Sequence, residues 1–490
     1  MASVVAIALV AAGCETTNLR NTFTGYSGQA RDFQAALASG SVDRIAAEEK
    51  SIERDCQSSD RILYLQERGR MRSIRGDRTG SIADYQIASD FFENKRMEDS
   101  VSAASAFFNV AAIATNDLAI PYEGHSFEKV MLHNEQAMNY LVAGNFDFAR
   151  IELNHADVEQ VYSLEKHARL VAEAERKSQD QKLELGDAGT TLQQKSSQAA
   201  FGAGAVKNSF QNAFTFFLRG SLFEESGDYD KALIEYKKAL EIFPENRFVA
   251  ESAMRTARLC GASRDRENLT NIFGKALKGE RCPEGSGRIV VVFESGFVTG
   301  RSSFRLPFIY NGEIVELVMP YYDTASYHPS DELDVACGGI SSRTQTLCNL
   351  EAMAVRSLQE DYNPILIRQI LRMIAKYQMQ KAADDKNPLL GFTAKVATLA
   401  TDRADDRNWL TLPQSVQIAD SFVPAGRQSV SLAVQGLARS ITVDVVAGKT
   451  VYIIVSQMGQ NLAVRSASLV EETPPPAASA APASDSSSVR

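Results

Sequence analysis

The side chains that most often perform catalysis are spread through this chain without the spacing that catalysis requires. Ser163 and Lys166 match the first element of a penicillin-binding site, but the Ser-Asp-Asn and Lys-Thr-Gly elements that complete such a site are absent from the sequence. The chain also contains no His-Glu-x-x-His motif, no Gly-x-Ser-x-Gly motif and no P-loop. We therefore expect no catalytic residues and no cofactor, and the sequence predicts a protein that is not an enzyme.

The five histidines show no spacing that is typical of metal ligands. Only His125 draws notice, because it directly follows the turn expected at residues 122–124, and we interpret it as a structural histidine rather than a base. The cysteines lack the Cys-x-x-Cys spacing of zinc and redox sites. The sequence therefore predicts no metal site.

Cysteine usage indicates an oxidising compartment, because two pairs lie close in sequence and could form disulfide bonds. We expect Cys260 to pair with Cys282, and Cys337 to pair with Cys348. Cys56 then has no partner in this scheme, and we expect it to be a buried free thiol.

The remaining cysteine, Cys14, ends an apolar run at the amino terminus. The segment Ala11-Ala12-Gly13-Cys14 resembles a bacterial lipobox, in which the cysteine becomes the first mature residue and carries acyl chains such as palmitate. This resemblance implies that residues 1–13 are a lipoprotein signal peptide and residues 14–27 a tether. Glu15 is not the Asp that favours inner-membrane retention, so the implied location is the outer membrane, facing the periplasm. The alternative is an apolar segment with an incidental cysteine.

Composition and charge narrow the class of protein. The chain has 490 residues, of which 44% are apolar, which is enough to build folded domains. Its net charge of −9 argues against a nucleic-acid partner and against a basic membrane-binding patch. A membrane attachment would therefore depend on the lipid at the amino terminus.

Residues 213–246 have the length and the small and aromatic positions of two antiparallel helices. The small side chains let the two helices approach, and the aromatic side chains fill the seam between them. This segment resembles one tetratricopeptide (TPR) repeat. The positions that match the pattern are Phe216, Gly220, Phe223, Ala232, Tyr236, Ala239 and Pro244.

TPR repeats stack into concave surfaces that bind proteins or peptides. The resemblance implies that the first helix exposes Phe214, Phe217, Ser221 and Glu224 on this concave face. We therefore expect these four side chains to bind a partner protein or peptide. The alternative is that a helix within residues 160–212 covers them.

Two weaker repeats precede the strong one. Residues 62–95 place Gly69, Ser81, Tyr85 and Ala88 at TPR positions, and residues 130–163 do the same with Ala137, Tyr140, Ala149, Leu153 and Ala156. We expect residues 28–281 to form one TPR-like helical domain.

The carboxyl half changes character. Residues 289–293 are a continuous apolar run typical of a buried strand, and Asn311-Gly312 indicates a hairpin between residues 304–310 and 314–319. Alternating strands return between Val416 and Val455.

We therefore expect residues 288–470 to form a mixed, β-rich, sandwich-like domain with helices at about 346–400. Within that helical segment, Asn363-Pro364 indicates a helix start. Residues 471–490 are rich in Pro, Ala and Ser, and we expect them to be disordered. The predicted fold class is α+β and multidomain, with a TPR-like solenoid followed by this β-rich domain.

The segment 404–413 contains the only tryptophan, Trp409, among charged neighbours. We interpret it as an Asp-Arg lock at a domain junction; the alternative is a sugar-binding tryptophan. Together with residues 120–124, 127–130 and 304–307, this segment is similar to a family of TPR-containing bacterial envelope lipoproteins that has no established activity. The resemblance implies the architecture and not a mechanism.

These observations favour a binding scaffold in cell-envelope or surface-structure assembly, with an envelope protein or peptide as its partner. The first alternative is a regulator of a peptidoglycan synthesis enzyme. The second is an envelope hydrolase with a site in the carboxyl half, which would require facing carboxylates or a Ser-His pair in a cleft there.

Overall fold

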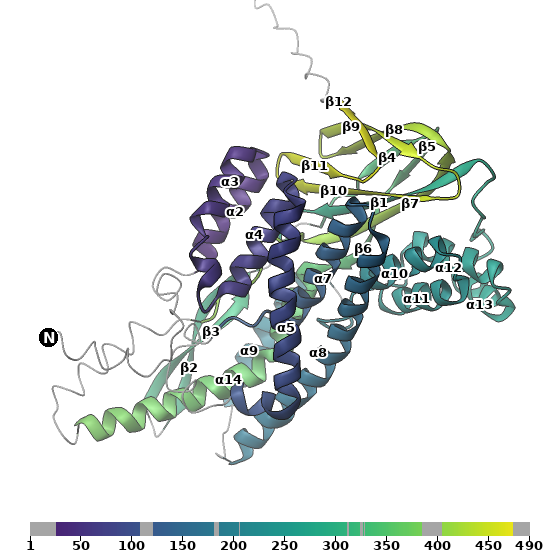
Figure 1. The fold of residues 1–490 in the computed structure, drawn as a ribbon. Coiled ribbons are helices and arrows are strands. Elements are labelled where there is room, and N and C mark those ends of the chain that lie inside the picture. Colours follow the sequence, from purple (N-terminus) through teal and green to yellow (C-terminus); the bar gives the residue numbers. More distant parts are fainter. Residues whose placement is uncertain are drawn as a thin grey trace, which may run out of the picture.

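The computed structural model describes residues 26–107, 121–180, 186–204, 206–310, 313–323, 327, 329–384 and 404–473. A layer of helices packs against one face of a β-sheet, and a second sheet covers the other face of that sheet (Figure 1). The predicted α+β architecture, with helices first and strands later, is confirmed. The predicted signal peptide, the lipidation site Cys14 and most of the predicted tether lie outside the described residues.

The helical layer is built from consecutive antiparallel helices. In chain order these are α2 (Tyr26–Ser39), α3 (Val42–Ser51), the short η1 (Asp55–Gln57), α4 (Arg61–Arg75), α5 (Arg78–Phe107), α7 (Ser126–Val142), α8 (Phe146–Asp180), α9 (Gly186–Ala203), α10 (Ala213–Glu225), α11 (Tyr229–Ile242), α12 (Arg247–Leu259) and α13 (Ser263–Phe273). None of the described helices has the length and apolar content needed to cross a membrane.

The hairpins α4–α5 and α10–α11 each contain the same kind of close contact, between a glycine on the first helix and a tyrosine ring on the second. A Cβ atom added to Gly69 would lie 2.4 Å from the Tyr85 ring, and one added to Gly220 would lie 2.7 Å from the Tyr236 ring. The two residues of each pair are 16 positions apart in the chain. Both glycines are therefore required for the same reason: any side chain would push the second helix away.

Two five-stranded sheets form a sandwich. The first has the order β11-β10-β1-β7-β6 and the second β12-β9-β8-β4-β5. Strand β1 pairs in parallel with β10 and antiparallel with β7. The strands of the first sheet are β1 (Ser286–Ser295), β6 (Gln345–Asn349), β7 (Ser415–Pro424), β10 (Thr450–Met458) and β11 (Asn461–Arg465), and those of the second are β4 (Asp334–Cys337), β5 (Ile340–Arg343), β8 (Gly426–Val434), β9 (Leu437–Val445) and β12 (Leu469–Thr473).

The middle of strand β1, residues 289–293, is apolar because it is buried on both faces. Val290 and Val292 belong to the core that the helices share, whereas Ile289, Val291 and Phe293 belong to the core between the two sheets. Because side chains alternate along a strand, Arg288 and Glu294 lie on the helix-facing side with Val290 and Val292. Strand β1 is thus the element that joins the two halves of the molecule.

Outside the sandwich, the expected hairpin forms between β2 (Arg301–Tyr310) and β3 (Glu313–Tyr322), and its predicted turn at 311–312 lies outside the described residues. The helical segment expected at about 346–400 is one helix, α14 (Leu350–Asp384), as far as the chain is described. Pro364 lies inside α14, so the helix start predicted there is wrong. Strand β12 extends to Thr473 and includes the first three residues of the tail expected to be disordered; residues 474–490 lie outside the described chain.

The structure does not form either of the expected disulfides, because all five described cysteines are free. Cys337 lies in β4, in the core between the sheets, whereas Cys348 lies in β6, in the core shared with the helices. Cys260 caps α12, and Cys282 is exposed in the segment before β1. Nearness in sequence was misleading because the members of each pair belong to different elements. Cys56 is a buried free thiol, as predicted.

Candidate functional site: the concave face of the helical domain

The four side chains expected to bind a partner are not on a free surface. Phe214, Phe217 and Ser221 are 0% exposed, and the side chain of Glu224 is 12% exposed. The prediction that they bind an external partner is therefore contradicted for this folded state. Among the seven TPR positions, five are buried, namely Phe216, Gly220, Ala232, Tyr236 and Ala239, whereas Phe223 is half-buried and Pro244 is exposed.

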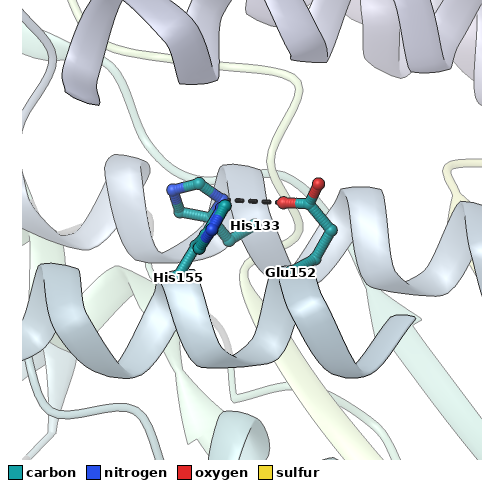
Figure 2. Close-up of side chains that lie close together, drawn as sticks. All are labelled: His133, Glu152 and His155. Carbon is teal, nitrogen blue, oxygen red and sulfur yellow. Dashed lines mark hydrogen bonds and ion pairs between the residues drawn. The ribbon is translucent and has the colours of Figure 1, made fainter. Parts of the chain in front are cut away.

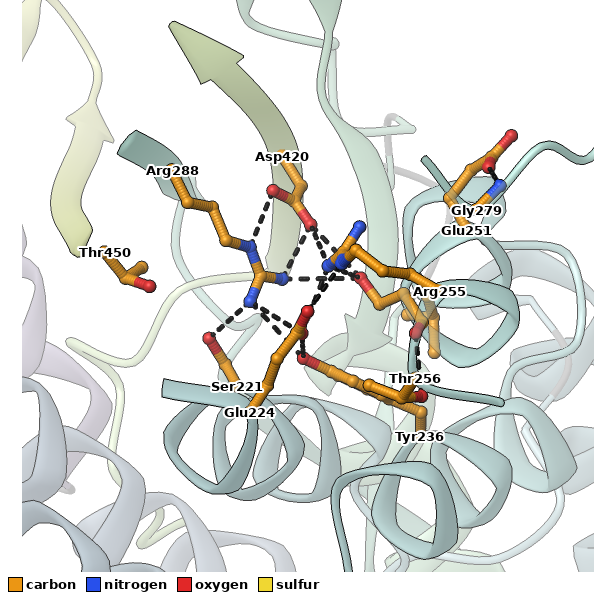
Figure 3. A network of polar contacts seen from close by, with 12 residues as sticks. Ser221, Glu224, Tyr236, Glu251, Arg255, Thr256, Gly279, Arg288, Asp420 and Thr450 are labelled. Atoms are coloured by element: carbon orange, nitrogen blue, oxygen red, sulfur yellow. Dashed lines mark hydrogen bonds and ion pairs between the residues drawn. The ribbon is translucent and has the colours of Figure 1, made fainter. Parts of the chain in front are cut away.

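The chain's own first sheet occupies the concave face. The Ser221 hydroxyl lies 2.7 Å from the Tyr452 hydroxyl on β10, and Arg288 on β1 donates to Glu224 at 3.0 Å. Figure 3 shows Ser221 and Glu224 of α10 directed at Arg288. Ser221 and Glu224 thus both reach the sheet, and Glu224 also accepts from Arg255 and Tyr236; none of these partners lies within residues 160–212, which was the alternative cover.

Two arginines and two carboxylates alternate at this contact (Figure 3). Arg288 donates to both oxygens of Asp420 on β7, at 2.8 and 2.6 Å. Arg255 on α12 donates to Glu224 at 2.5 Å and to Asp420 at 3.4 Å. The Tyr236 hydroxyl, from the second TPR helix, also donates to Glu224, at 2.7 Å. Each of the four charged side chains therefore has two partners of opposite charge.

Burial alone would raise the pKa of both carboxyl groups, since it disfavours the charged form. The adjacent Arg288 and Arg255 guanidinium groups outweigh burial and hold the pKa of Glu224 and of Asp420 below their ordinary values. The two carboxylates and the two guanidinium groups are therefore all charged, and their charges cancel. This contact fixes the helical layer to the sheet without providing a free acid or base.

The first TPR-like hairpin binds the sheet in an equivalent way. Arg70 follows Gly69 just as Ser221 follows Gly220, and it donates to Glu294 on β1 at 2.8 Å and to Glu135 on α7 at 2.7 Å. Arg465 on β11 donates to the second oxygen of Glu294 at 2.9 Å. Arg70 and Glu294 are almost fully buried. Both hairpins thus present their concave faces to the same sheet.

The segment before β7 is held by buried glutamates of the helical layer. The backbone N–H of Trp409 donates to Glu128 on α7 at 2.7 Å, and the backbone N–H of Leu410 donates to Glu67 on α4 at 2.8 Å. The indole of Trp409 is 0% exposed, and its ring centroid lies 5.7 Å from that of Tyr85. A sugar-binding role for Trp409 is therefore excluded in this fold.

The Asp-Arg lock expected in this segment is confirmed. Arg407 donates to Asp405 at 2.7 and 2.9 Å and to Asp60, which precedes α4, at 2.6 Å. The Arg407 guanidinium also lies over the Tyr122 ring, 5.5 Å from its centroid. Arg407 therefore ties residues 404–413 to the helical layer through its contacts with Asp60 and Tyr122.

This lock predicts a specific loss of stability in acid. Burial would raise the pKa of Asp405, but Arg407 lowers it from 3.8 to about 2. A depressed carboxyl pKa adds stability above the unfolded value, and this stability is lost as the pH falls through the folded value. We expect Asp405 to contribute about 2 kcal/mol above pH ~4, lost between pH ~4 and ~2.

The measurement is urea unfolding at a series of pH values, followed by the fluorescence of Trp409, which is the only tryptophan in the chain. Asp405→Asn should be less stable than the unaltered protein at neutral pH, and this difference should shrink as the pH approaches 2. A difference that stays constant with pH would contradict the assignment.

Comparison with known protein families agrees with the helical hairpin at the site. The tetratricopeptide repeat family model matches residues 213–246, which span α10 and α11. A search of curated proteins finds no match to the chain. The protein therefore contains a TPR repeat, and this repeat indicates a role in protein–protein interaction.

Sequence reasoning identifies Ser221 and Glu224 as functional residues. It misses their partners Arg288 and Asp420 on the sheet. Arg288 and Asp420 each lie next to apolar residues of their strand, and their side chains are only 5% and 6% exposed. A charged residue within an apolar strand pattern indicates either an edge or a buried ion pair, and this was the available signal for both residues. Nothing in the repeat pattern itself pointed to them.

Proposed function

We propose that this protein is a lipid-anchored envelope protein, attached to the outer membrane through Cys14 and facing the periplasm, that acts as an interaction scaffold in envelope or surface-structure assembly. The TPR repeat supports the interaction role, and the lipobox resemblance supports the anchor. Because the concave face is occupied by the protein's own sheet, the partner binds elsewhere. We assign partner binding to the outer face of α8.

The observation that carries this proposal is a row of exposed apolar side chains on α8. Phe148, Ile151 and Val158 are 51%, 46% and 49% exposed, and Val161 continues the row. The first three are separated by three and seven residues, so they share one face of the helix. Several exposed apolar side chains on one helix face are costly in water and are typical of a binding surface. Figure 1 shows α8 extending away from the sheets along the helical layer.

The spacing of this row favours a helical partner. Positions 148, 151, 155 and 158 follow the three-four alternation by which two helices pack side by side. A partner helix with an apolar face would bury these side chains as in a two-helix seam. The expected partner is therefore an envelope protein that presents an amphipathic helix.

The test is a crosslinking pull-down of the full-length protein from its native envelope. Ile151→Lys/Val158→Lys should reduce recovery of a discrete partner at least about tenfold, because a lysine charge would have to be buried in an apolar seam. Ile234→Lys is the matched control: Ile234 lies on α11, is 53% exposed, and should leave recovery unchanged. Cys14→Ala should move the protein from the membrane fraction to the soluble fraction.

The outcomes separate the functional alternatives. A partner that survives the α8 double variant would refute this surface, and a Cys14→Ala protein that stays in the membrane would refute the anchor. If the partner lost from the double variant is a peptidoglycan synthesis enzyme, the protein is a regulator of that enzyme rather than an assembly scaffold.

A further inference from the structure

Three side chains with metal-ligating atoms meet between α7 and α8. His133 comes from α7, and Glu152 and His155 come from α8. One donor atom from each lies within 4.8 Å of the other two, and His133 Nδ1 is 2.9 Å from Glu152 Oε2. Figure 2 shows both imidazole rings beside the same carboxylate.

The helix hairpin positions these side chains before any ligand arrives. Glu152 and His155 are three residues apart, so they lie on one face of α8, and the hairpin register brings His133 opposite them. His133 and Glu152 are 3% and 5% exposed. His155 is half-buried, so the cluster is closed on the side of the core and reachable from the surface.

We propose that His133, Glu152 and His155 bind one divalent transition-metal ion, with Zn²⁺ as the best fit. Two imidazoles and one carboxylate are a recurrent zinc ligand set, and water can supply the fourth ligand. The carboxylate cancels part of the ion's charge, while imidazole ligands favour zinc over magnesium and calcium. Ligand bonds of about 2.0–2.2 Å require donor atoms roughly 3.3 Å apart, so His133 and Glu152 need to separate by only a few tenths of an ångström.

One further carboxylate lies on the same face of α8 as Glu152 and His155. Glu159 lies one helical turn after His155, and its Oε1 is a buried carboxylate oxygen for which the described residues supply no hydrogen-bond donor. Its other oxygen accepts from Arg96 at 3.2 Å. Arg96 offsets the charge of Glu159, so the proposal depends on the three ligands themselves and not on this neighbour.

Metal binding would connect α7 to α8 and stabilise the hairpin. In the metal-free form the His133 Nδ1–H donates to Glu152, and for Nδ1 to coordinate the ion the neutral ring must carry its proton on Nε2 instead. His155 also stands in the α8 row that would face the proposed partner, but zinc binding can be measured on the protein alone and does not require that partner.

The test uses full-length protein treated with a chelator and then titrated with Zn²⁺ in a calorimeter. We expect one ion per chain and a rise in the thermal unfolding midpoint, since a ligand that binds only the folded state stabilises it. Co²⁺ in place of Zn²⁺ should give a visible absorption band. Glu152→Gln and His155→Ala should each weaken Zn²⁺ binding at least about 100-fold, more than the loss of an outer hydrogen bond to a ligand.

His167→Ala is the matched control, because His167 is a half-buried histidine on the same helix outside the cluster, 4.0 Å from Asp361. It should bind Zn²⁺ as the unaltered protein does. Circular dichroism establishes folding of each variant, and His155→Ala alone decides if Glu152→Gln fails to fold. Absence of stoichiometric binding in the unaltered protein overturns the proposal. So does binding that survives in the variants, because other residues would then hold the ion.

Discussion

Replacing Phe214 and Phe217 with alanine should destabilise the whole protein rather than remove a binding surface. Both rings are fully buried in the core shared by helices and sheet, and Phe217 lies 5.9 Å from Tyr236, centroid to centroid. A buried Phe→Ala change costs about 3–5 kcal/mol, because it loses apolar burial and leaves a cavity. Two such changes approach the total stability of a typical domain, roughly 5–15 kcal/mol.

Urea unfolding of the double variant, followed by circular dichroism, measures this loss. Phe148→Ala is the matched control, since it makes the same change at a half-exposed position on α8, where surface substitutions typically stay within about 0.5 kcal/mol. A double variant as stable as the control would mean that the TPR concave face is open in solution. Phe214 and Phe217 would then be accessible to a partner, as the TPR resemblance implies.

The sequence predicts the local packing of the repeat well because that packing depends on side-chain size within one hairpin. Gly220 must be small because it touches the Tyr236 ring, and both residues lie within one 34-residue pattern. The same relation between Gly69 and Tyr85 makes the first weak repeat recognisable. Close contacts between neighbouring helices leave such a trace at fixed spacing.

The cover of the concave face leaves no comparable trace. Glu224 and Arg288 are far apart in the chain and meet only because β1 docks across α10. The apolar run in β1 indicates that both faces are buried, but it does not indicate which layer covers each face. The expected disulfides failed for a related reason: chain proximity does not place two cysteines in the same layer.

The cluster of His133, Glu152 and His155 can be predicted from the sequence only in part. Glu152 and His155 have helical spacing that the sequence shows directly, whereas His133 joins them only through the register of the hairpin. The second weak repeat supplies that register, because Ala137 and Leu153 are buried at the positions of Gly220 and Tyr236 in the strong repeat. Combining the repeat alignment with the histidine positions could have found this site from sequence.

Replacing Arg288 with methionine should lower the free energy of unfolding by about 3–5 kcal/mol, as is typical when one partner of a buried ion network is removed. Methionine keeps the length of the side chain but not its charge. Asp420 then keeps only the 3.4 Å contact with Arg255 and a 3.1 Å hydrogen bond from Ser252, and Glu224 loses its bond to the sheet. The fluorescence of Trp409, buried at the same layer boundary, can follow urea unfolding.

Arg343→Met is the matched control, because Arg343 forms an exposed ion pair with Asp334 in the second sheet, and exposed pairs contribute little. A double variant, Arg288→Met/Asp420→Leu, gives the stronger test. Asp420→Leu alone leaves Arg288 short of a partner, so the double variant should be less destabilised than the sum of the two single changes. Additive losses would mean that the two charges do not depend on each other, and the helical layer and the sheet would then be joined mainly by their apolar contacts.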